Sequence, residues 1–217
     1  MSKLPSLYFP VMDNGSDLCR VGYATSMIAM VGSGVLEGRD VIFDPTSYPY
    51  PDGNANIATQ TFLESGYDEM VIFDVDVLFT PQQVQWLLSH DQGIVCGIVP
   101  KKKPGLEYSI IPLESNPKPF GGLEDLCEVQ VACRGCMRIQ RKVFEVLKNH
   151  SKVKQYKCLE TGRMSWEFWR NIAGGTSDDF EFCRRYREMG GKVYVDKRVT
   201  LQHAGNVTYP IKGNLLS

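Results

Sequence analysis

Long hydrophobic runs and a strong charge of either sign are both missing from this 217-residue chain. No stretch approaches the ~18 consecutive apolar residues of a transmembrane helix, and the N-terminus has no basic segment followed by an apolar one. We therefore expect neither a membrane span nor a signal peptide. The formal net charge of −1 lacks the basic excess of nucleic-acid-binding proteins, so a nucleic-acid partner is not expected either.

A cysteine framework is also missing. The seven cysteines are odd in number and scattered, which favours reduced thiols and a cytosolic protein, acting in the host cytoplasm if a virus encodes it. Cys133 and Cys136 form a CxxC pair, but no second ligand pair follows at zinc-finger spacing. Buried thiols are therefore favoured over a structural zinc site.

The first half of the chain does contain a regular alternation of strand and helix patterns. Strands are predicted at residues 6–12, 41–43, 70–73 and 93–99, and helices at residues 18–31, 54–65 and 81–90. This order predicts an α/β fold with a mostly parallel central sheet in an α/β/α sandwich.

The second half is less regular than the first. Strands are predicted at residues 128–133, 137–139, 192–196 and 199–202, and helices at residues 141–148 and 178–189. No repeat or linker interrupts the chain, so we predict a single domain over residues 1–217.

The most informative feature is the acidic pair Asp74 and Asp76, which follows the apolar residues 70–73. Uncompensated charge at the end of a buried strand is costly, and a divalent cation with oxygen ligands is the usual compensation. If the strand continues through both residues, alternate side chains share a face and the carboxylates point the same way. The pair predicts a metal site at the C-terminal edge of the sheet, where open α/β folds bind ligands. The alternative is that Asp74 caps a loop and Asp76 begins the next helix.

Asp178 and Asp179 form a second acidic pair, which opens a predicted helix after a Gly-Gly sequence. Acidic residues favour a helix N-terminus for electrostatic reasons alone. The glycines also permit a close backbone approach, and a carboxylate here can act as a general base. His203 follows the last predicted strand, where it is either a ligand for a manganese-class ion or a polar loop residue.

Two further groups have both a functional and a structural interpretation. The basic run from Lys101 to Lys103 follows the fourth predicted strand, where it can meet phosphate charge or stay solvated. Trp166, Phe168 and Trp169 can stack on sugar rings and bases or fill the core.

Together these features resemble the GT-A type of nucleotide-sugar-dependent glycosyltransferase, from the first strand to about residue 210. The motifs follow the order of that family: Asn56-Ile57-Ala58 and Phe62-Leu63-Glu64-Ser65 before the first acidic pair, Gly135-Cys136-Met137-Arg138-Ile139 before residues 141–144, then Ser177-Asp178-Asp179-Phe180 and His203-Ala204-Gly205. Two positions depart from the pattern. Ala55 stands where many relatives have arginine, and Asp178 stands where the second acidic motif usually has glutamate.

The resemblance implies that Mn²⁺ or Mg²⁺ holds the diphosphate of a nucleotide sugar, a UDP-sugar by default. The sugar would move to the hydroxyl of a glycan, a protein or another acceptor. Asp76 and His203 would ligate the metal, and Asp74 would be a further ligand or a ribose contact. Asp179, with Asp178 beside it, would be the base for the acceptor hydroxyl in an inverting reaction.

The same resemblance implies a nucleotide-binding part over residues 1 to about 100 and an acceptor-binding part over the rest, to residue 217. Asp44, at the end of the second predicted strand, would meet the base or ribose. The other residues expected to bind the donor are Pro10, Val11, Met12, Asn56 and Lys101.

Three other functions share parts of this pattern. Phosphatases and phosphotransferases of the haloacid dehalogenase type also use Asp-x-Asp after a hydrophobic strand, but their motif continues Gly-Thr, whereas Val77 and Leu78 follow here. A nucleotidyltransferase with a similar sheet would have a Gly-rich, basic loop after the first strand, where this chain has Asp13-Asn14-Gly15-Ser16. A sugar-binding module without catalysis is disfavoured by the intact acidic residues.

Overall fold

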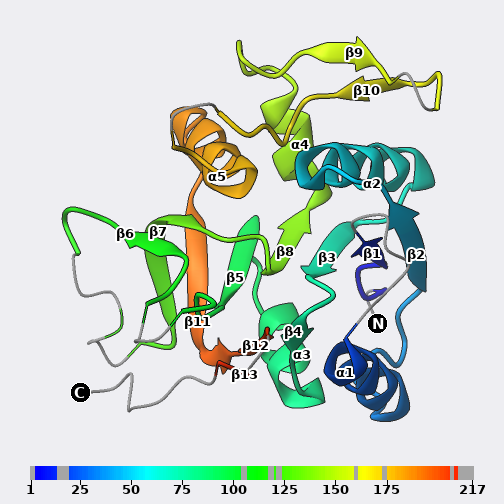
Figure 1. The fold of residues 1–217 in the computed structure, drawn as a ribbon, viewed down its shortest axis with the longest axis vertical. Helices are drawn as coiled ribbons and strands as arrows, with labels where there is room; N and C mark the ends of the chain where they lie inside the picture. Colours follow the sequence, from blue (N-terminus) through cyan, green and yellow to red (C-terminus); the bar gives the residue numbers. More distant parts are fainter. Residues whose placement is uncertain are drawn as a thin grey trace.

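The computed structural model describes residues 3–13, 20–103, 107–116, 120, 124–158, 161–172 and 175–205, and the backbone of residues 208–209. Within these residues a central sheet of eight strands runs in the order β2-β1-β3-β8-β5-β11-β7-β6 (Figure 1). Its strands are β1 (Leu7–Asp13), β2 (Val41–Ser47), β3 (Glu69–Phe73), β5 (Ile94–Ile98), β6 (Ile110–Pro112), β7 (Leu126–Ala132), β8 (Cys136–Gln140) and β11 (Val193–Thr200).

The sheet is mostly parallel, which confirms the predicted fold class. Strand β1 pairs in parallel with β2 and with β3, and β11 pairs in parallel with β5. Strand β8 pairs antiparallel with both β3 and β5, while β7 pairs antiparallel with β11 and β6. Following these pairings across the described sheet leaves only β8 and β7 opposed to the others. The insertion of β8 between β3 and β5 is the part of the topology that the sequence pattern did not predict.

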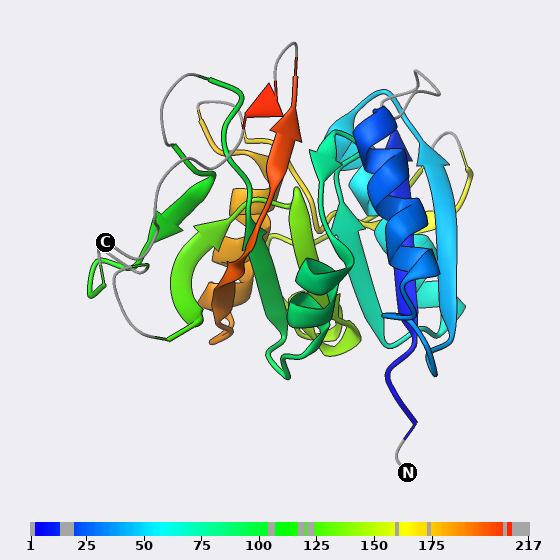
Figure 2. The ribbon, with the colours of Figure 1, turned by 90° about the horizontal axis from the view of Figure 1, so that it is seen from below.

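Helices cover both faces of the sheet, as Figure 2 shows. Helices α1 (Val21–Gly32) and α3 (Pro81–Leu88) pack with the core that contains Leu7, Phe9 and Val71. The helices of the other face pack with the core that contains Tyr8 and Met70; they are α2 (Pro51–Ser65), α4 (Arg141–Leu147) and α5 (Asp178–Glu188). Neighbouring residues of β1 thus serve different cores, because successive side chains of a strand point to opposite faces.

Two small sheets flank the central one. Strands β4 (Val77–Leu78), β12 (Gln202–Ala204) and β13 (Thr208–Tyr209) form the first, at the edge where β3 ends. Strands β9 (Gln155–Lys157) and β10 (Met164–Trp166) form an antiparallel hairpin that contacts α2 (Figure 1). Each small sheet brings a late part of the chain next to an early one: β12 pairs with β4, and β10 contacts α2.

Several boundaries differ from the predicted ones. Strand β2 runs through Asp44 and Pro45, where the sequence predicted its end, because β2 is an edge strand and a proline there loses no ladder hydrogen bond. Helix α2 begins at Pro51 rather than at residue 54, since proline suits the first helical turn. Helix α1 begins after Arg20, and residues 18–19, where the predicted helix started, lie outside the described residues.

The strand patterns near the C-terminus also merge. The strand predicted at residues 192–196 and the start of the one predicted at residues 199–202 form a single strand, β11, which ends at Thr200, while Gln202 begins β12. Its Asp196 is fully buried and accepts a hydrogen bond from the Arg198 backbone N–H at 2.9 Å, with His90 Nε2 2.7 Å from its other oxygen. Because these partners compensate the buried charge of Asp196, the strand can continue through the polar residues between the two predicted strands.

The interior contains free thiols and one fully buried ion pair that links neighbouring strands. Cys96, Cys133, Cys136 and Cys183 are buried free thiols, as expected for the CxxC residues. Arg138 of β8 donates to Glu69 of β3 at 2.8 Å and to the Gln92 carbonyl at 3.0 Å. Among the described residues no helix has the length and apolar character needed to cross a lipid bilayer.

Candidate functional site

The acidic pair after β3 lies in a turn. Strand β3 ends at Phe73, and the Val77 N–H donates to the Asp74 carbonyl at 2.9 Å, which closes the turn over Asp74 and Asp76. The expectation that the strand continues and aims both carboxylates the same way is therefore wrong. In a strand the two side chains would lie on the same face. The turn reverses the chain direction instead, so the two carboxylates have different surroundings.

Asp76 meets His203 across the small sheet. His203 Nε2 is 3.3 Å from Asp76 Oδ1, and the Ala204 N–H donates to the Asp76 carbonyl at 2.7 Å. These contacts follow from the pairing of β12 with β4, which sets His203 opposite Val77. Residues separated in sequence by more than half the chain are thus brought together by two short strands.

The Pro100 carbonyl fixes the tautomer of His203. It lies 2.8 Å from His203 Nδ1, and since a carbonyl can only accept, Nδ1 carries the proton. The other nitrogen, Nε2, then carries a lone pair and faces the Asp76 carboxylate. The lone pair and the carboxylate oxygen repel each other unless a cation lies between them. A metal ion or a second proton on the ring satisfies this need, and such carbonyl-bound histidines are typical of metal sites.

Lys102 contacts the other oxygen of Asp76, Oδ2. Burial opposes the ionisation of Asp76, but the contacts with His203 and Lys102 outweigh it and lower the pKa of this carboxyl to about 2. Asp76 is therefore an anion at neutral pH, with positive charge already gathered beside it. Lys101, which the resemblance implied as a donor contact, pairs with Glu107 at 3.2 Å.

Arg134 organises the opposite end of the site. Its guanidinium contacts Asp178 Oδ2, its backbone N–H donates to Asp179 Oδ2 at 3.0 Å, and its side chain is 11% exposed. The guanidinium also lies 5.4 Å from the centre of the Trp169 ring. Sequence reasoning missed this residue; the available signal was a single arginine directly before the Gly135 motif.

Asp74 lies on the buried side of the turn, toward Arg134. Its backbone N–H donates to the Gly135 carbonyl at 3.1 Å, and a Cβ on Gly135 would be 3.3 Å from Asp74 Oδ2. Burial raises the pKa of Asp74; Arg134 acts against this shift, while the charges of Asp76 and Asp179 add to it. One electrostatic site therefore contains the carboxylates of both acidic motifs.

The second acidic motif begins α5, as predicted. Asp178 is buried against Arg134, and its N–H donates to Asn171 Oδ1 at 3.2 Å. Asp179 is more open: its Oδ1 accepts from the Phe180 N–H at 2.8 Å and from the hydroxyl of Ser177. Of the two carboxylates, Asp179 is the one with room to meet an incoming hydroxyl.

The residues predicted to contact the nucleotide lie on β1, β2 and α2. Pro10 and Met12 of β1 are buried and Val11 between them is partly exposed. Asp44 lies in the middle of β2 rather than at its end, and its Oδ2 accepts from the hydroxyl of Tyr8. Burial first, and then this carboxylate, raises the pKa of Tyr8.

Asn56 has a structural role that the sequence did not predict. Its Nδ2 donates to the Trp169 carbonyl at 2.7 Å, and its Oδ1 accepts from the Trp169 N–H at 3.0 Å. Trp169 Nε1 also donates to Thr59 Oγ1 at 2.8 Å. Helix α2 therefore holds Trp169 rigidly beside Arg134.

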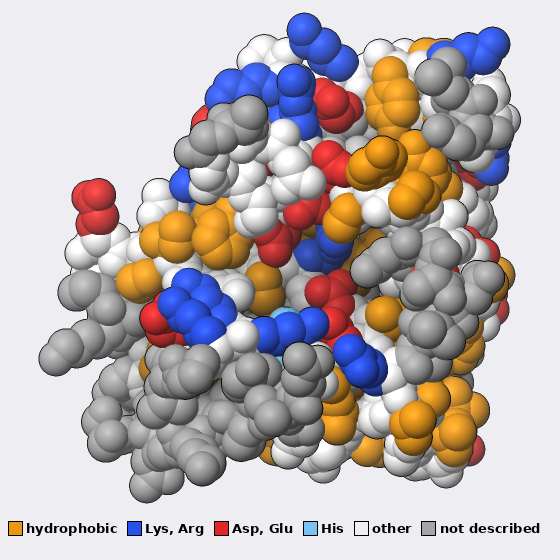
Figure 3. Space-filling model, in the orientation of Figure 1, with side chains coloured by type: hydrophobic (Ala, Val, Ile, Leu, Met, Phe, Trp, Pro, Cys, Tyr) orange, Lys and Arg blue, Asp and Glu red, His pale blue; other side chains and the backbone are white. Residues whose placement is uncertain are grey.

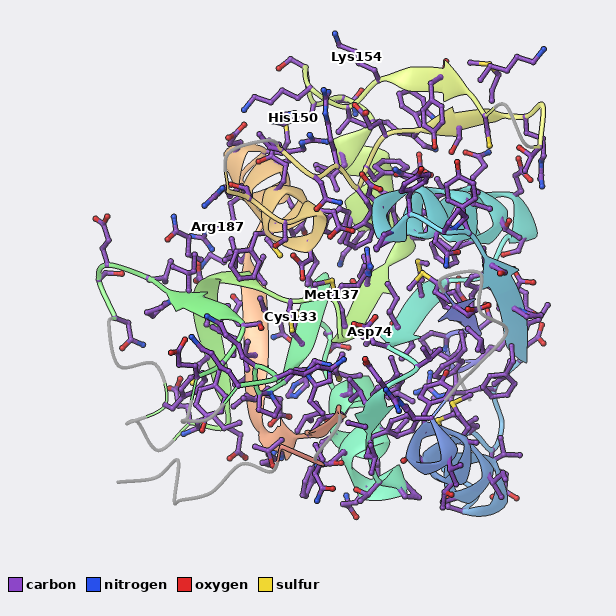
Figure 4. All side chains as sticks on the ribbon, in the orientation of Figure 1. Asp74, Cys133, Met137, His150, Lys154 and Arg187 are labelled. Carbon is purple, nitrogen blue, oxygen red and sulfur yellow. The ribbon has the colours of Figure 1, made fainter. Side chains whose placement is uncertain are left out.

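The charged residues of the site are gathered on one face of the molecule. Figure 3 shows acidic and basic side chains meeting around a hollow at the centre of this face, and Figure 4 labels Asp74 there, with His150 at the far end beside the hairpin. Within the described ranges, no group of three or more His, Cys, Asp or Glu side chains has the geometry of a complete metal site. Asp76 and His203 are thus a pair of protein ligands that an ion would share with other oxygen donors.

The chain has a GT-A-like fold. No protein-family model and no curated protein sequence matches it. The viral protein A197 from STIV is 19% identical, with a TM-score of 0.54 over 92% of this chain and 86% of that one. GalNAc-T7, solved with UDP, GalNAc and Mn²⁺, is 10% identical, with a TM-score of 0.52 over 100% of this chain and 47% of that one.

A third solved structure has the same fold. A mutant of Drosophila β-1,4-galactosyltransferase 7, in complex with manganese, UDP-Gal and xylobiose, is 13% identical, with a TM-score of 0.50 over 93% of this chain and 71% of that one. At these identities the likeness shows the fold alone. It agrees with the architecture that the order of motifs in the sequence implied.

Proposed function

We propose that this protein is a metal-dependent glycosyltransferase, which moves a sugar from a nucleotide sugar, a UDP-sugar by default, to an acceptor hydroxyl. The observation that carries the proposal is the pairing of Asp76 Oδ1 with His203 Nε2, 3.3 Å apart beside the end of β3. GalNAc-T7 and the galactosyltransferase, which share the fold, were solved with manganese and uridine nucleotides. Their ligands support the same ligand class here.

The residues of this pair fit Mn²⁺ or Mg²⁺. Asp76 is ionised at neutral pH, and the Pro100 carbonyl directs the Nε2 nitrogen of His203 toward it. Such ions commonly take only one or two protein ligands and complete their coordination with water and phosphate oxygens. When bound, the cation would supply positive charge to the diphosphate as its bond to the sugar breaks.

Residues around the pair bind and orient the donor in this proposal. The ammonium of Lys102, already beside Asp76, is placed to meet a phosphate oxygen. The carboxyl of Asp74, next to Asp76 in the same turn, can form a hydrogen bond with a ribose hydroxyl. The nucleotide lies against β1 and β2, with Asp44 facing the base or ribose, and the acceptor meets the second half of the chain.

Asp179 is the base in an inverting transfer. Its carboxylate is held at the N-terminus of α5 by the Arg134 N–H at 3.0 Å, and it removes the proton of the attacking hydroxyl. Arg134 positions this carboxylate through its backbone and Asp178 through its side chain. We place the reaction in a reducing compartment such as the cytosol, because Cys96, Cys133, Cys136 and Cys183 are free thiols.

The phosphatase alternative needs Asp74 as a nucleophile. Burial raises the pKa of Asp74, and Gly135 packs directly against its carboxylate. A carboxyl whose ionisation is opposed by burial is a poorer nucleophile, so the surroundings of Asp74 disfavour covalent phosphoryl transfer.

The test is an activity assay with a panel of nucleotide sugars, in which turnover is measured as release of the nucleoside diphosphate. We expect release with at least one donor in the presence of Mn²⁺, its loss in excess chelator, and its loss in Asp76→Ala. Asp91→Ala, which removes an exposed carboxylate before β5, is the matched control and should keep full activity. Undiminished release in chelator or in Asp76→Ala would contradict the proposal.

A further inference from the structure

A second cavity lies between the start of α2 and the β9–β10 hairpin. Its volume is about 400 Å³, and no part of it is formed by the Asp76–His203 pair. Four aromatic side chains line it: Tyr48, Tyr50, Tyr156 and Trp169. Figure 3 shows hydrophobic side chains gathered over α2 on the same face as the central hollow. A cavity of this size and aromatic content is typical of small-ligand sites.

Two of the aromatic rings, Tyr48 and Tyr50, pack against each other in the cavity lining. Tyr48 and Tyr50 meet edge to face with their ring centres 5.9 Å apart, and Tyr50 is 66% exposed at the cavity mouth. A Cβ on Gly53 would be only 2.3 Å from the Tyr48 ring, so the glycine is what lets this ring lie against α2. Flat apolar faces with a polar edge suit the C–H faces of a sugar ring.

The charges in the cavity select against an anion. Asp52 and Glu167 contribute two carboxylates, and Lys157 contributes one ammonium group. Asp52 Oδ1 accepts from the Gly53 N–H at 2.9 Å, and Glu167 Oε2 pairs with Arg170 at 3.2 Å. Carboxylate oxygens accept more than one hydrogen bond, so both groups can still receive hydroxyl donors. The lining therefore fits a neutral ligand with many hydroxyls better than a phosphate.

The cavity is joined to the candidate base by direct contacts. Trp169 forms part of its wall and carries Arg134 on its ring at 5.4 Å. Asn171 links the two sites: its N–H donates to Asp52 Oδ2 at 3.4 Å, and its Oδ1 accepts from the Asp178 N–H at 3.2 Å. A ligand in the cavity thus lies against the loop that leads into Asp179.

We propose that this cavity is a saccharide site that binds the acceptor, so that the acceptor is a glycan whose hydroxyl is directed toward Asp179. The proposal rests on the proposed glycosyl transfer and specifies its acceptor class. Tyr50 and Tyr156 stack on the sugar, Asp52 and Glu167 accept from its hydroxyls, and Trp169 fixes the wall nearest the base. The hairpin, from the second half of the chain, closes the site from outside.

The experiment is binding of the purified protein to an array of immobilised oligosaccharides, with UDP and Mn²⁺ present. We expect binding to a related set of glycans, weakened at least tenfold in Tyr50→Ala and in Tyr156→Ala, about the effect of losing one stacked ring. Tyr50 is largely exposed, so its replacement leaves the fold intact. Met164→Ala on β10, an exposed residue outside the cavity lining, is the matched control and should bind as the native protein does.

Calorimetry with UDP and Mn²⁺ on the same proteins separates this proposal from the proposed function. Equal UDP affinity in all of them, with glycan binding lost in the tyrosine variants, supports the saccharide site. No glycan bound by the native protein, or glycan binding unaffected by both tyrosine replacements, overturns it. Weaker UDP affinity in Tyr50→Ala overturns it too, because the cavity would then hold the nucleotide. Absence of UDP binding in the native protein contradicts the proposed function instead.

Discussion

Asp74 and Asp76 are two residues apart, yet they belong to opposite ends of the candidate site. Asp76 is partly open, shared between His203 and Lys102, and its pKa is lowered to about 2. Asp74 is enclosed by Gly135 and near Arg134, and its pKa is raised. The turn after β3 thus makes one carboxylate an anion that needs a cation and leaves the other suited to a neutral role.

The largest expected effect is at the enclosed end, on catalysis. For an inverting transfer, Asp179→Asn removes the base and should lower kcat by about a thousandfold, or about 4 kcal/mol. Donor affinity should not change, because the carboxamide keeps the shape of the side chain. Rates are measured by nucleotide release with acceptor present, beside Asp91→Asn. An unchanged kcat would remove Asp179 from the chemistry.

Arg134 tests how the enclosed end is stabilised. Arg134→Met leaves the carboxylate of Asp178 without its buried counter-charge, and should lower the free energy of unfolding by about 3 kcal/mol. Urea denaturation measures this. Arg163→Met removes an exposed partner of Glu64 and should cost less than about 1 kcal/mol. Equal losses in the two variants would show that Arg134 does not organise the site.

The open end predicts a pH dependence. The pKa of Asp76 falls from its ordinary value of 3.8 to about 2 in the folded protein. A lowered folded-state pKa stabilises the protein fully above about pH 4, and this stabilisation is lost as the pH falls through about 2. At neutral pH the free energy of unfolding of the wild type should exceed that of Asp76→Asn by at most about 2 kcal/mol. Plotted against pH, the free energies of unfolding of the two proteins should converge near pH 2. A difference that stays constant with pH would refute the lowered pKa of Asp76.

The smallest expected effect concerns Lys102. Its pair with Asp76 is half-exposed, so Lys102→Met should change the free energy of unfolding by less than about 1 kcal/mol. Without the ammonium group, Asp76 attracts a divalent cation more strongly, and Mn²⁺ alone should bind more tightly than to wild type. Lys101→Met, which removes the partner of Glu107, is the matched control. Weaker Mn²⁺ binding in Lys102→Met would mean that Lys102 helps to hold the site together.

Local patterns predicted much of this fold. The apolar run into Asp74 identified β3, and Asp178 marked the start of α5 where the helix does begin. Thr80 and Pro81 predicted the start of α3, and the structure confirms it with a full capping box between Thr80 and Gln83. These features could be predicted because each depends on residues that are close together in the chain.

The missed features depend on residues that are far apart. Strand β8 lies between β3 and β5 in the sheet, and its own sequence does not indicate which strands it pairs with. Asn56 and Trp169 are 113 residues apart, so their reciprocal hydrogen bonds left no local pattern. Arg134 gains its role only where three loops converge. The spacing of Asp74 and Asp76 suits a strand and a turn equally, so the sequence could not choose between them.

The most direct test of the central claim is electron paramagnetic resonance of Mn²⁺ added with UDP to the native protein. If Asp76 and His203 hold the cation against the diphosphate, the bound Mn²⁺ shows hyperfine coupling to a nitrogen and to phosphorus. The nitrogen coupling disappears in His203→Ala. A spectrum with phosphorus coupling but no nitrogen coupling in the native protein, or one that is identical in His203→Ala, would contradict the account.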